Sequence, residues 1–221
     1  HYVLLLLTPN AEAHPEARLR LALQQISCGS FTVALLIHNP RIREASHNNT
    51  QYFLNQIALN GVCLYPANNG TLKVGQQVQR DREHSQRFQL KCEAVANVYL
   101  EAAVSITQVD VELAIVALLH EAVYQTTLAL IEKEWGYVPI GLPLAVLMDI
   151  AQHCSPLPAI HFPNQTQAQK RDNKRIFAPP SMLYYWLNLD APNTDIENCI
   201  AKCQAYTDAV HQRTPSQYQY V

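Results

Sequence analysis

Apolar residues in the first third of the chain occur in short continuous runs that alternate with segments of helical period. The runs Tyr2–Leu7, Phe31–Ile37 and Val62–Tyr65 have the length and composition of buried strands. Residues 15–26 and 45–59 instead place their apolar side chains three or four positions apart, which is typical of helices. The alternation of strand and helix predicts a small mixed sheet with right-handed crossovers.

After Gly75 the apolar spacing changes to the helical period of about 3.6 residues. A break is expected at Pro179-Pro180, because proline lacks the amide proton that a helix interior needs. We therefore predict an α+β fold, with an α/β domain over residues 1–75 and an all-helical bundle over residues 80–213. The helices of the bundle are predicted at 81–107, 110–134, 142–153, 167–189 (interrupted) and 194–212.

The segment 110–134 has the widest apolar face of the chain, as expected for the central helix of a bundle. Asp110 is a suitable N-cap for it, and Gly136 with Pro139 should end it. In the preceding helix the apolar residues at helical spacing are Phe88, Cys92, Val95, Tyr99, Ala102 and Ile106.

Composition narrows the classes of protein. The chain has 221 residues, of which 48% are hydrophobic and 15% charged, so it is globular. The net charge of −2 argues against a general polyanion-binding surface but leaves room for a local basic patch. The longest apolar stretches, Tyr2–Leu7 and Val111–Leu119, are interrupted or too short to span a bilayer, and no signal peptide precedes the first strand. We expect a cytoplasmic protein without membrane contact. His1 stands directly inside an apolar run, so we also expect further residues before it.

The six cysteines are scattered and form no CxxC pair, which predicts free thiols that pack as small hydrophobes. Cys199 and Cys203 are four residues apart and could both face a metal. A stable zinc site needs four ligands, and no further pair stands out, so core packing is favoured and no metal site is predicted.

Four segments of the second half resemble the HEPN domain family. Leu118–Gln125, with its His120-Glu121-Ala122, and the loop Trp135–Pro139 resemble the central HEPN helix and the loop after it. Phe162-Pro163 and Lys174–Phe177 resemble the approach to the fourth helix of that family. The resemblance implies a homodimer formed through the bundle, and the wide apolar face of 110–134 is compatible with such pairing.

Upstream, Tyr52–Ile57 and Gly61–Tyr65 resemble the end of the minimal nucleotidyltransferase that bacteria fuse to HEPN domains. Such enzymes need a Gly-Ser turn and an Asp-x-Asp pair that holds Mg²⁺ against the triphosphate. The pair should lie near His1 and Val3, where there is no acid, and Phe31–Ile37 carries none either. The first domain is thus a degenerate nucleotidyltransferase in our interpretation, and it is N-terminally incomplete if residues precede His1.

Active HEPN ribonucleases are characterised by an Arg-x4–6-His motif. The one formal match, Arg41 to His47, lies in the α/β half, and the region expected to carry the motif, residues 176–188, has neither Arg nor His. No catalytic residue is therefore predicted.

Three groups of residues are candidates for binding. His120 and Tyr124 could line a nucleotide pocket, or form a polar cluster satisfied between helices. Lys170-Arg171, Lys174 and Arg175 would share a helix face that could contact phosphate, or form ordinary solvated surface. Tyr184, with Tyr185 and Trp186, could stack on a base or pack on a neighbouring helix. The candidate nucleotide- or RNA-binding residues are His120, Tyr124, Arg171, Lys174, Arg175 and Tyr184.

These observations lead to three hypotheses. The chain is a non-catalytic HEPN-type protein that binds a nucleotide or RNA, or one that binds a partner protein, in a toxin–antitoxin or stress-defence context. Alternatively, it is an active nucleotidyltransferase or a divergent HEPN ribonuclease. No cofactor is assigned, and a Mg²⁺-nucleotide complex is the one that the resemblance suggests. The missing acids and the missing Arg–His pair favour the non-catalytic hypotheses, which the sequence does not separate.

Overall fold

The computed structural model is mostly helical in the part of the chain that it describes. That part consists of residues 2–7, 19, 22, 23, 25, 26, 33–38, 48–64, 78–107, 111–139, 141–182 and 195–212. The chain divides into two compact units. The first comprises His1–Ser85, Trp135–Val138 and Ser216–Val221, and the second comprises Gln86–Glu134 and Pro139–Pro215.

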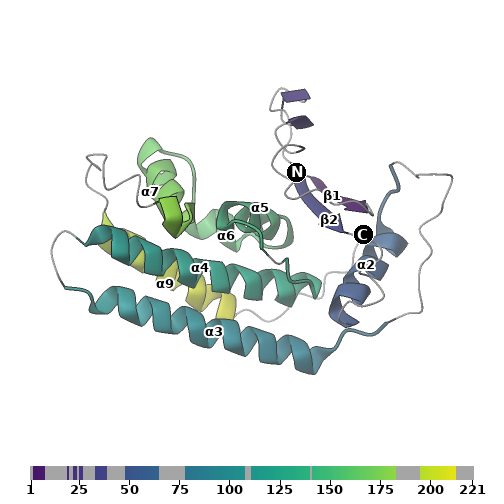
Figure 1. The fold of residues 1–221 in the computed structure, drawn as a ribbon, viewed down its shortest axis with the longest axis horizontal. Coiled ribbons are helices and arrows are strands. Elements are labelled where there is room, and N and C mark those ends of the chain that lie inside the picture. Colours follow the sequence, from purple (N-terminus) through teal and green to yellow (C-terminus); the bar gives the residue numbers. More distant parts are fainter. Residues whose placement is uncertain are drawn as a thin grey trace. The chain divides into compact units, whose positions relative to one another are not determined.

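Two parallel strands form the sheet of the first unit. β1 (Tyr2–Leu7) pairs with β2 (Val33–His38) in a register that runs from Tyr2 opposite Val33 to Leu7 opposite His38 (Figure 1). Both strands were expected from their apolar runs. Parallel neighbours need a long crossover connection, and the helix predicted over residues 15–26 lies in that connection. Most of it falls outside the described residues, and the positions that are described, 19, 22, 23, 25 and 26, are helical.

The prediction of a third strand at Val62–Tyr65 is wrong for the residues of this segment that the structure describes. α2 (Asn48–Asn60) is confirmed close to its expected bounds, and the Gly61 amide donates to the Ile57 carbonyl at 2.7 Å. After this turn Val62 and Leu64 are exposed and form no strand, while Tyr65 lies outside the described residues. A four-residue apolar run becomes a strand only where a neighbouring strand satisfies its backbone, and none pairs with residues 62–64.

Aromatic packing around the turn Trp135-Gly136-Tyr137 completes the described core of the first unit. Phe53 of α2 stacks on Tyr137 with ring centroids 4.5 Å apart and on Trp135 at 5.8 Å. Between them Gly136 has a φ of 66°, and a Cβ atom there would lie 3.1 Å from Nε of Arg80. Gly136 therefore ends the long helix before it, as predicted, because the left-handed conformation suits glycine. Burial raises the pKa of Tyr137 to about 12.

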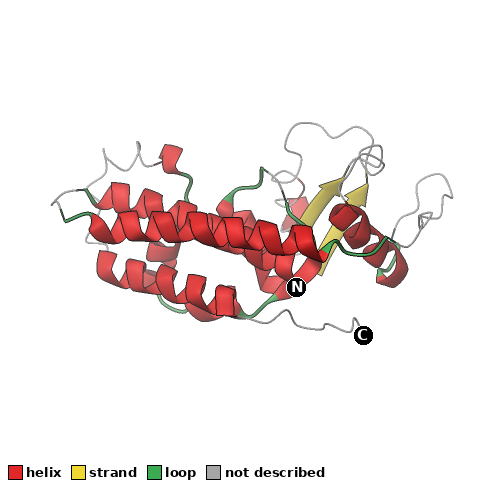
Figure 2. Cartoon of the chain, turned by 90° about the horizontal axis from the view of Figure 1, so that it is seen from below, coloured by secondary structure: helices red, strands yellow, loops and turns green. Residues whose placement is uncertain are grey.

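Helices build the second unit, and α3, α4 and α9 run alongside one another (Figures 1 and 2). The predicted helices are confirmed to within a few residues where the structure describes them, whereas α6 was not predicted. The proline break is also confirmed, because α7 ends before Ala178, which is extended. Asp110 and residues 183–189 lie outside the described part. The bounds are α3 (Arg82–Ser105), α4 (Glu112–Trp135), α5 (Leu144–Cys154), α6 (Leu157–His161), α7 (Gln167–Phe177), the 3-10 turn η3 (Pro180–Met182) and α9 (Ile196–Gln212).

α4 is the central helix, as its wide apolar face predicted. Every residue from Thr126 to Lys133 is buried, so this stretch is enclosed on all sides. Within the described residues, α4 is also the helix that is long and apolar enough to cross a membrane by length and composition alone. Since 67% of its apolar window is buried in the protein, it has the character of a core helix.

The buried face of α3 differs from the expected one. Its most buried apolar positions are Cys92, Ala96, Leu100 and Ala103, whereas Val95, which belongs to the predicted set, is exposed. The other members of that set apart from Cys92 are half-buried at the edges of the interface. Two sides of this helix carry apolar residues, and the side with the alanines faces inward. Small side chains let helix axes approach more closely, which favours that orientation.

Candidate functional site

His120 lies on α4 and is held by α7. Its ring is buried, and Nδ1 lies 2.8 Å from the backbone carbonyl oxygen of Ile176. A carbonyl oxygen can only accept, so Nδ1 carries a proton and donates it to this oxygen. This contact fixes the ring between two helices. It supports the reading of His120 as a satisfied polar group within the bundle.

Tyr124 follows one turn later on the same face of α4. Its ring stacks near that of His120, with centroids 6.4 Å apart and an angle of 25°. The phenol is only partly buried, and its pKa is raised by that burial and by the Glu121 carboxylate. Tyr124 is therefore protonated at neutral pH and can donate a hydrogen bond. The structure brings the two predicted residues together, and of the two Tyr124 is the more accessible.

α7 carries the predicted basic residues, and its local sequence explains where it begins. The Thr166 hydroxyl accepts from the Gln169 amide at 3.2 Å, and the Gln169 side-chain oxygen accepts from the Thr166 amide at 3.0 Å. This reciprocal capping box satisfies donors that the first turn of a helix leaves unpaired. The buried side of α7 consists of Asp172, Asn173 and Ile176. α7 is thus anchored at its first turn and along one side.

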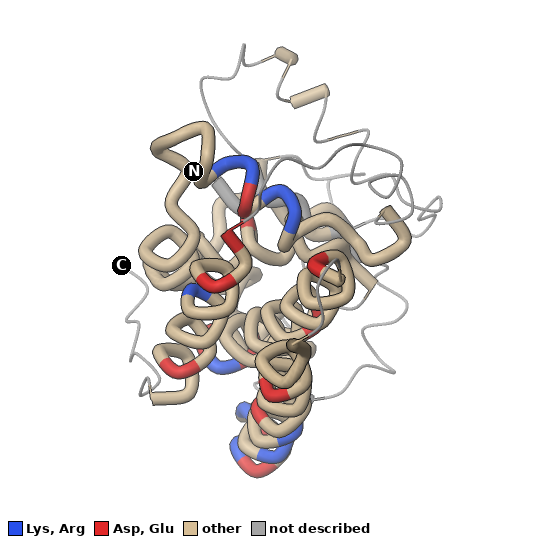
Figure 3. The backbone as a smooth tube through the Cα atoms, turned by 90° about the vertical axis from the view of Figure 1, so that its left-hand side faces the viewer, with Lys and Arg blue, Asp and Glu red and all other residues tan. Residues whose placement is uncertain are grey.

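The cations of α7 lie mostly on its exposed side, although Nη1 of Arg175 is buried. Lys170, Arg171 and Lys174 are exposed and Arg175 is half-buried. At about 100° per residue these positions span an arc of about 140° on the helix surface. They share a face, as the sequence predicted, and form two basic stretches that Figure 3 shows in blue near the top of the view. We call this group of four residues the basic face of α7.

One cation of the basic face has an acidic neighbour on its own helix. Nε of Arg171 lies 3.9 Å from Oδ1 of Asp172, which is a long ion pair. A chain with a net charge of −2 thus carries four cations within six residues of α7. The remaining candidate, Tyr184, lies outside the described residues together with Tyr185 and Trp186.

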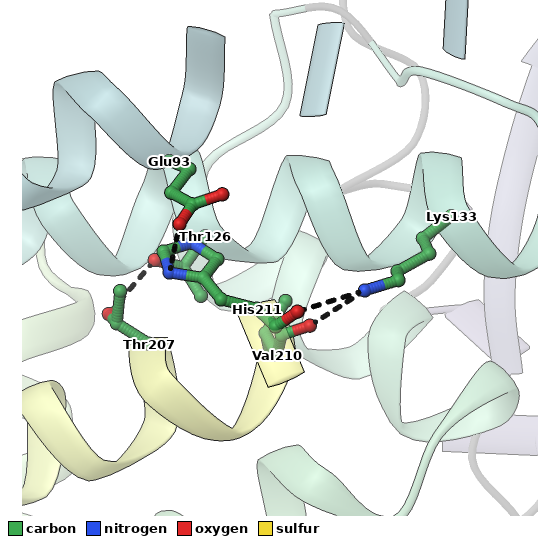
Figure 4. A network of polar contacts seen from close by, with 6 residues as sticks. All are labelled: Glu93, Thr126, Lys133, Thr207, Val210 and His211. Carbon is green, nitrogen blue, oxygen red and sulfur yellow. Dashed lines mark hydrogen bonds and ion pairs between the residues drawn. The ribbon is translucent and has the colours of Figure 1, made fainter. Parts of the chain in front are cut away.

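A buried polar network, which sequence reasoning missed, joins α3, α4 and α9 (Figure 4). Lys133 is 9% exposed, and its Nζ donates to the carbonyl oxygens of Val210 at 3.0 Å and His211 at 3.5 Å. These carbonyls belong to the last turn of α9, where helical partners are missing and a cation is favoured. The sequence contains a signal for this burial, because Lys133 follows Leu119 and Thr126 at intervals of seven residues and so lies on the same face of α4.

Further polar side chains of these three helices are held in pairs. Glu132 is 1% exposed and accepts from Nε2 of Gln89 at 2.7 Å. Nδ1 of His211 lies 3.6 Å from Oε1 of Glu93, and the hydroxyls of Thr126 and Thr207 are 3.0 Å apart. Burial lowers the pKa of His211 and outweighs the opposite effect of Glu93. These pairings connect three helices and give the network a structural role.

The cysteines of the described residues are free, and four of the five are buried. Burial raises the pKa of Cys92 and of Cys199 to about 11, and it also raises that of Cys203. These thiols therefore stay protonated at neutral pH, which makes them poor nucleophiles. In the part of the chain that the structure describes, no three His, Cys, Asp or Glu side chains are grouped so that they could hold a metal ion. Cys63 differs because it is exposed.

Comparison with family models, with curated proteins and with solved structures finds no match to this chain. The resemblance to HEPN domains and to minimal nucleotidyltransferases accordingly rests on the sequence motifs alone.

Proposed function

We propose that this protein is a non-catalytic binding protein, which holds the phosphate groups of a nucleotide or of an RNA strand on the basic face of α7. The observation that carries the proposal is the concentration of Lys170, Arg171 and Lys174 on the exposed side of one capped and anchored helix, with Arg175 half-buried next to them. Phosphate contacts by Lys and Arg supply most of the affinity in sequence-independent nucleic-acid binding.

Tyr124 is a second candidate for binding, and it lies on α4, outside the basic face of α7. The His120–Ile176 hydrogen bond ties the stretch of α4 that contains Tyr124 to α7. The phenol is only partly buried, so it is available for stacking or for donating a hydrogen bond. His120 contributes by fixing the two helices, because its Nδ1–H is already committed to the Ile176 carbonyl.

A finer identity follows from the sequence resemblance and is also part of the proposal. The second unit would be a HEPN-like bundle, and the first a nucleotidyltransferase-like α/β domain without catalytic acids, in a cytoplasmic toxin–antitoxin or stress-defence protein. The parallel strand pair followed by helices supports this order, as does the Gly136-Tyr137 turn after α4. The lack of an acid in β1 or β2 supports a binding role in place of nucleotide transfer.

The test is fluorescence anisotropy with labelled single-stranded RNA, measured over a range of salt concentrations. Each phosphate contact to a single strand contributes about 0.7 to the slope of log affinity against log salt. The double variant K170E/K174E should bind at least about tenfold more weakly and should lower that slope by about 1.4. Competition by ATP, with and without Mg²⁺, tests whether a free nucleotide occupies the same surface.

A matched control keeps the change in net charge but moves it away from α7. The variant R82E/K91E, with both changes at exposed positions of α3, alters the total charge by the same amount and leaves the basic face intact. It should retain most of the affinity and the full salt slope. The proposal fails if wild-type protein binds neither RNA nor nucleotides at millimolar concentration, or if the control loses as much affinity as K170E/K174E.

A further inference from the structure

The buried side of α7 is mainly polar. Asp172 is 6% exposed and Asn173 is 2% exposed, and Ile176 is the apolar residue beside them. Oδ1 of Asp172 and Oδ1 of Asn173 are both buried and accept no hydrogen bond. Nε of Arg171, at 3.9 Å from the Asp172 oxygen, is beyond hydrogen-bond distance. Each of these oxygens loses its hydrogen bonds to water on burial, so the docking of α7 carries a cost that detachment would remove.

Residues 163–177 are held together by hydrogen bonds of their own. Nδ2 of Asn173 donates to the carbonyl oxygen of Pro163 at 2.9 Å and to Oδ1 of Asn164 at 3.0 Å. The capping box described above ties the same loop to the first turn of α7. These bonds connect the loop and the helix with each other, so they stay intact when both move together. We call residues 163–177 the α7 segment.

The α7 segment is not continuous with a neighbouring helix. After α7, Ala178 is extended, and Pro179-Pro180 prevents the helix from continuing. Before the segment, α6 ends at His161, and Phe162 has a φ of −122° and a ψ of 62°, outside the helical region. Rotation of the backbone at these two points moves the α7 segment without bending a helix.

The α7 segment lies on α4 and α9 (Figure 1). Its tie to α4 is the bond from Nδ1 of His120 to the Ile176 carbonyl oxygen at 2.8 Å. At the end of the segment, the ring of Phe177 packs edge-on against Phe162 with centroids 5.2 Å apart. Detachment of the segment would therefore release the His120 ring.

On α9 the segment lies close to a buried thiol. Cys199 is 0% exposed. Burial raises its pKa to about 11, and the Asp172 carboxylate adds to this effect whereas Arg175 opposes it. Because these two residues of α7 act on the thiol, they lie near it in space. Detachment of the α7 segment would therefore also uncover Cys199.

We propose that the α7 segment is a latch, which detaches from α4 and α9 as one unit while the rest of the bundle stays folded. Detachment hydrates the two oxygens that lack hydrogen bonds and keeps the internal bonds of the segment. Local opening of this kind is expected where an element buries few apolar groups. The latch controls access to the His120 imidazole and the Cys199 thiol. It needs no ligand, so it is independent of the function proposed above.

The rate at which iodoacetamide modifies Cys199 in the native full chain measures detachment, with each cysteine followed by peptide mass spectrometry. Cys92 on α3 is the internal reference, because it is also buried and its pKa is also raised to about 11. Cys199 should react at least about tenfold faster than Cys92, since it becomes accessible by local opening and Cys92 only when the bundle unfolds.

Two substitutions should shift the latch in opposite directions. D172L replaces the carboxylate by an apolar side chain of similar shape, so it should slow the modification of Cys199 about tenfold and leave Cys92 unchanged. H120F removes the donor to the Ile176 carbonyl and should speed the modification of Cys199 about fivefold. The matched control is E197L, which makes the same change of charge at an exposed position of α9. It should leave both rates within about twofold of wild type.

Three outcomes would overturn the inference. Equal rates for Cys199 and Cys92 in the wild type would show that the α7 segment opens only with the whole bundle. An E197L variant that slows the modification of Cys199 as much as D172L would assign the effect to charge and not to the buried oxygen. An H120F variant that speeds both cysteines equally would show that the His120 bond stabilises the bundle as a whole and does not hold a latch.

Discussion

The two longest helices, α3 and α4, have the same length of 24 residues but opposite surroundings. α4 is enclosed, and even its charged residues Glu132 and Lys133 are buried with protein partners. α3 buries one narrow side and leaves Leu90 and Val98 in contact with solvent. Apolar content therefore does not by itself tell what a helix does in this protein. An apolar face that is enclosed stabilises the fold, whereas one that is left exposed contributes little to stability.

The same contrast separates the polar residues. Within the bundle, the hydrogen bonds of Lys133, Thr126 and Glu132 connect helices and satisfy groups that would otherwise be buried without partners. On the outward side of α7, the cations Lys170 and Lys174 face solvent. Substitutions inside the bundle should thus affect unfolding. Substitutions on the outward faces of α3 and α7 should leave stability unchanged.

The largest difference in the free energy of unfolding is expected when a leucine is replaced by alanine in each of the two helices. Leu119 of α4 is 0% exposed and Leu90 of α3 is 57% exposed. L119A removes fully buried methyl groups and leaves a cavity, so it should lower the free energy of unfolding by about 2–5 kcal/mol. L90A should change it by less than about 0.5 kcal/mol. Urea denaturation measures both. Equal losses would show that Leu90 is covered in the folded protein and would contradict the contrast between the helices.

A smaller difference is expected for a lysine in each helix. K133M keeps most of the side-chain volume but removes the donor to the Val210 and His211 carbonyls, so it should cost about 1–3 kcal/mol. Lys91 is exposed on α3, and K91M should be close to neutral. The same urea titration compares them. If K133M is as stable as wild type, apolar packing replaces the buried cation, as happens for some buried ion pairs.

Sequence reasoning correctly predicted the elements that rest on a long repeated pattern. The central helix α4 was identified because its wide apolar face extends over many turns, and the shared face of the α7 cations follows from helix geometry alone. Where the pattern was short or ambiguous, reasoning failed. Residues 62–64 looked like a strand but have no neighbour to pair with, and the five-residue α6 is too short to show a period.

The inward side of α3 was also beyond the sequence, since two of its sides are apolar and only tertiary packing decides between them. The same holds for His120. Its residue type is compatible with a ligand-binding role, but the Ile176 carbonyl that holds it lies 56 positions away in sequence. A partner of that kind appears only when the chain is folded. For the candidate site, the sequence thus supplied the residues of α7, and the fold showed which neighbouring groups are already committed.

The smallest expected effect is a pH dependence that comes from the interior of the bundle. Burial holds the pKa of His211 below its ordinary value of 6.5, although Glu93 and Asp208 oppose this and Lys133 adds to it. The unfolded chain therefore takes up the proton first as the pH falls below 6.5, and stability that is present above this value is lost. His153 and His161 have pKa values lowered by burial and act in the same direction. The melting temperature should fall between pH 7 and pH 5.5, and H211N should make that decline shallower. An unchanged slope in H211N would mean that the folded protein takes up a proton at His211 without loss of stability, so that this part of the bundle is open to solvent.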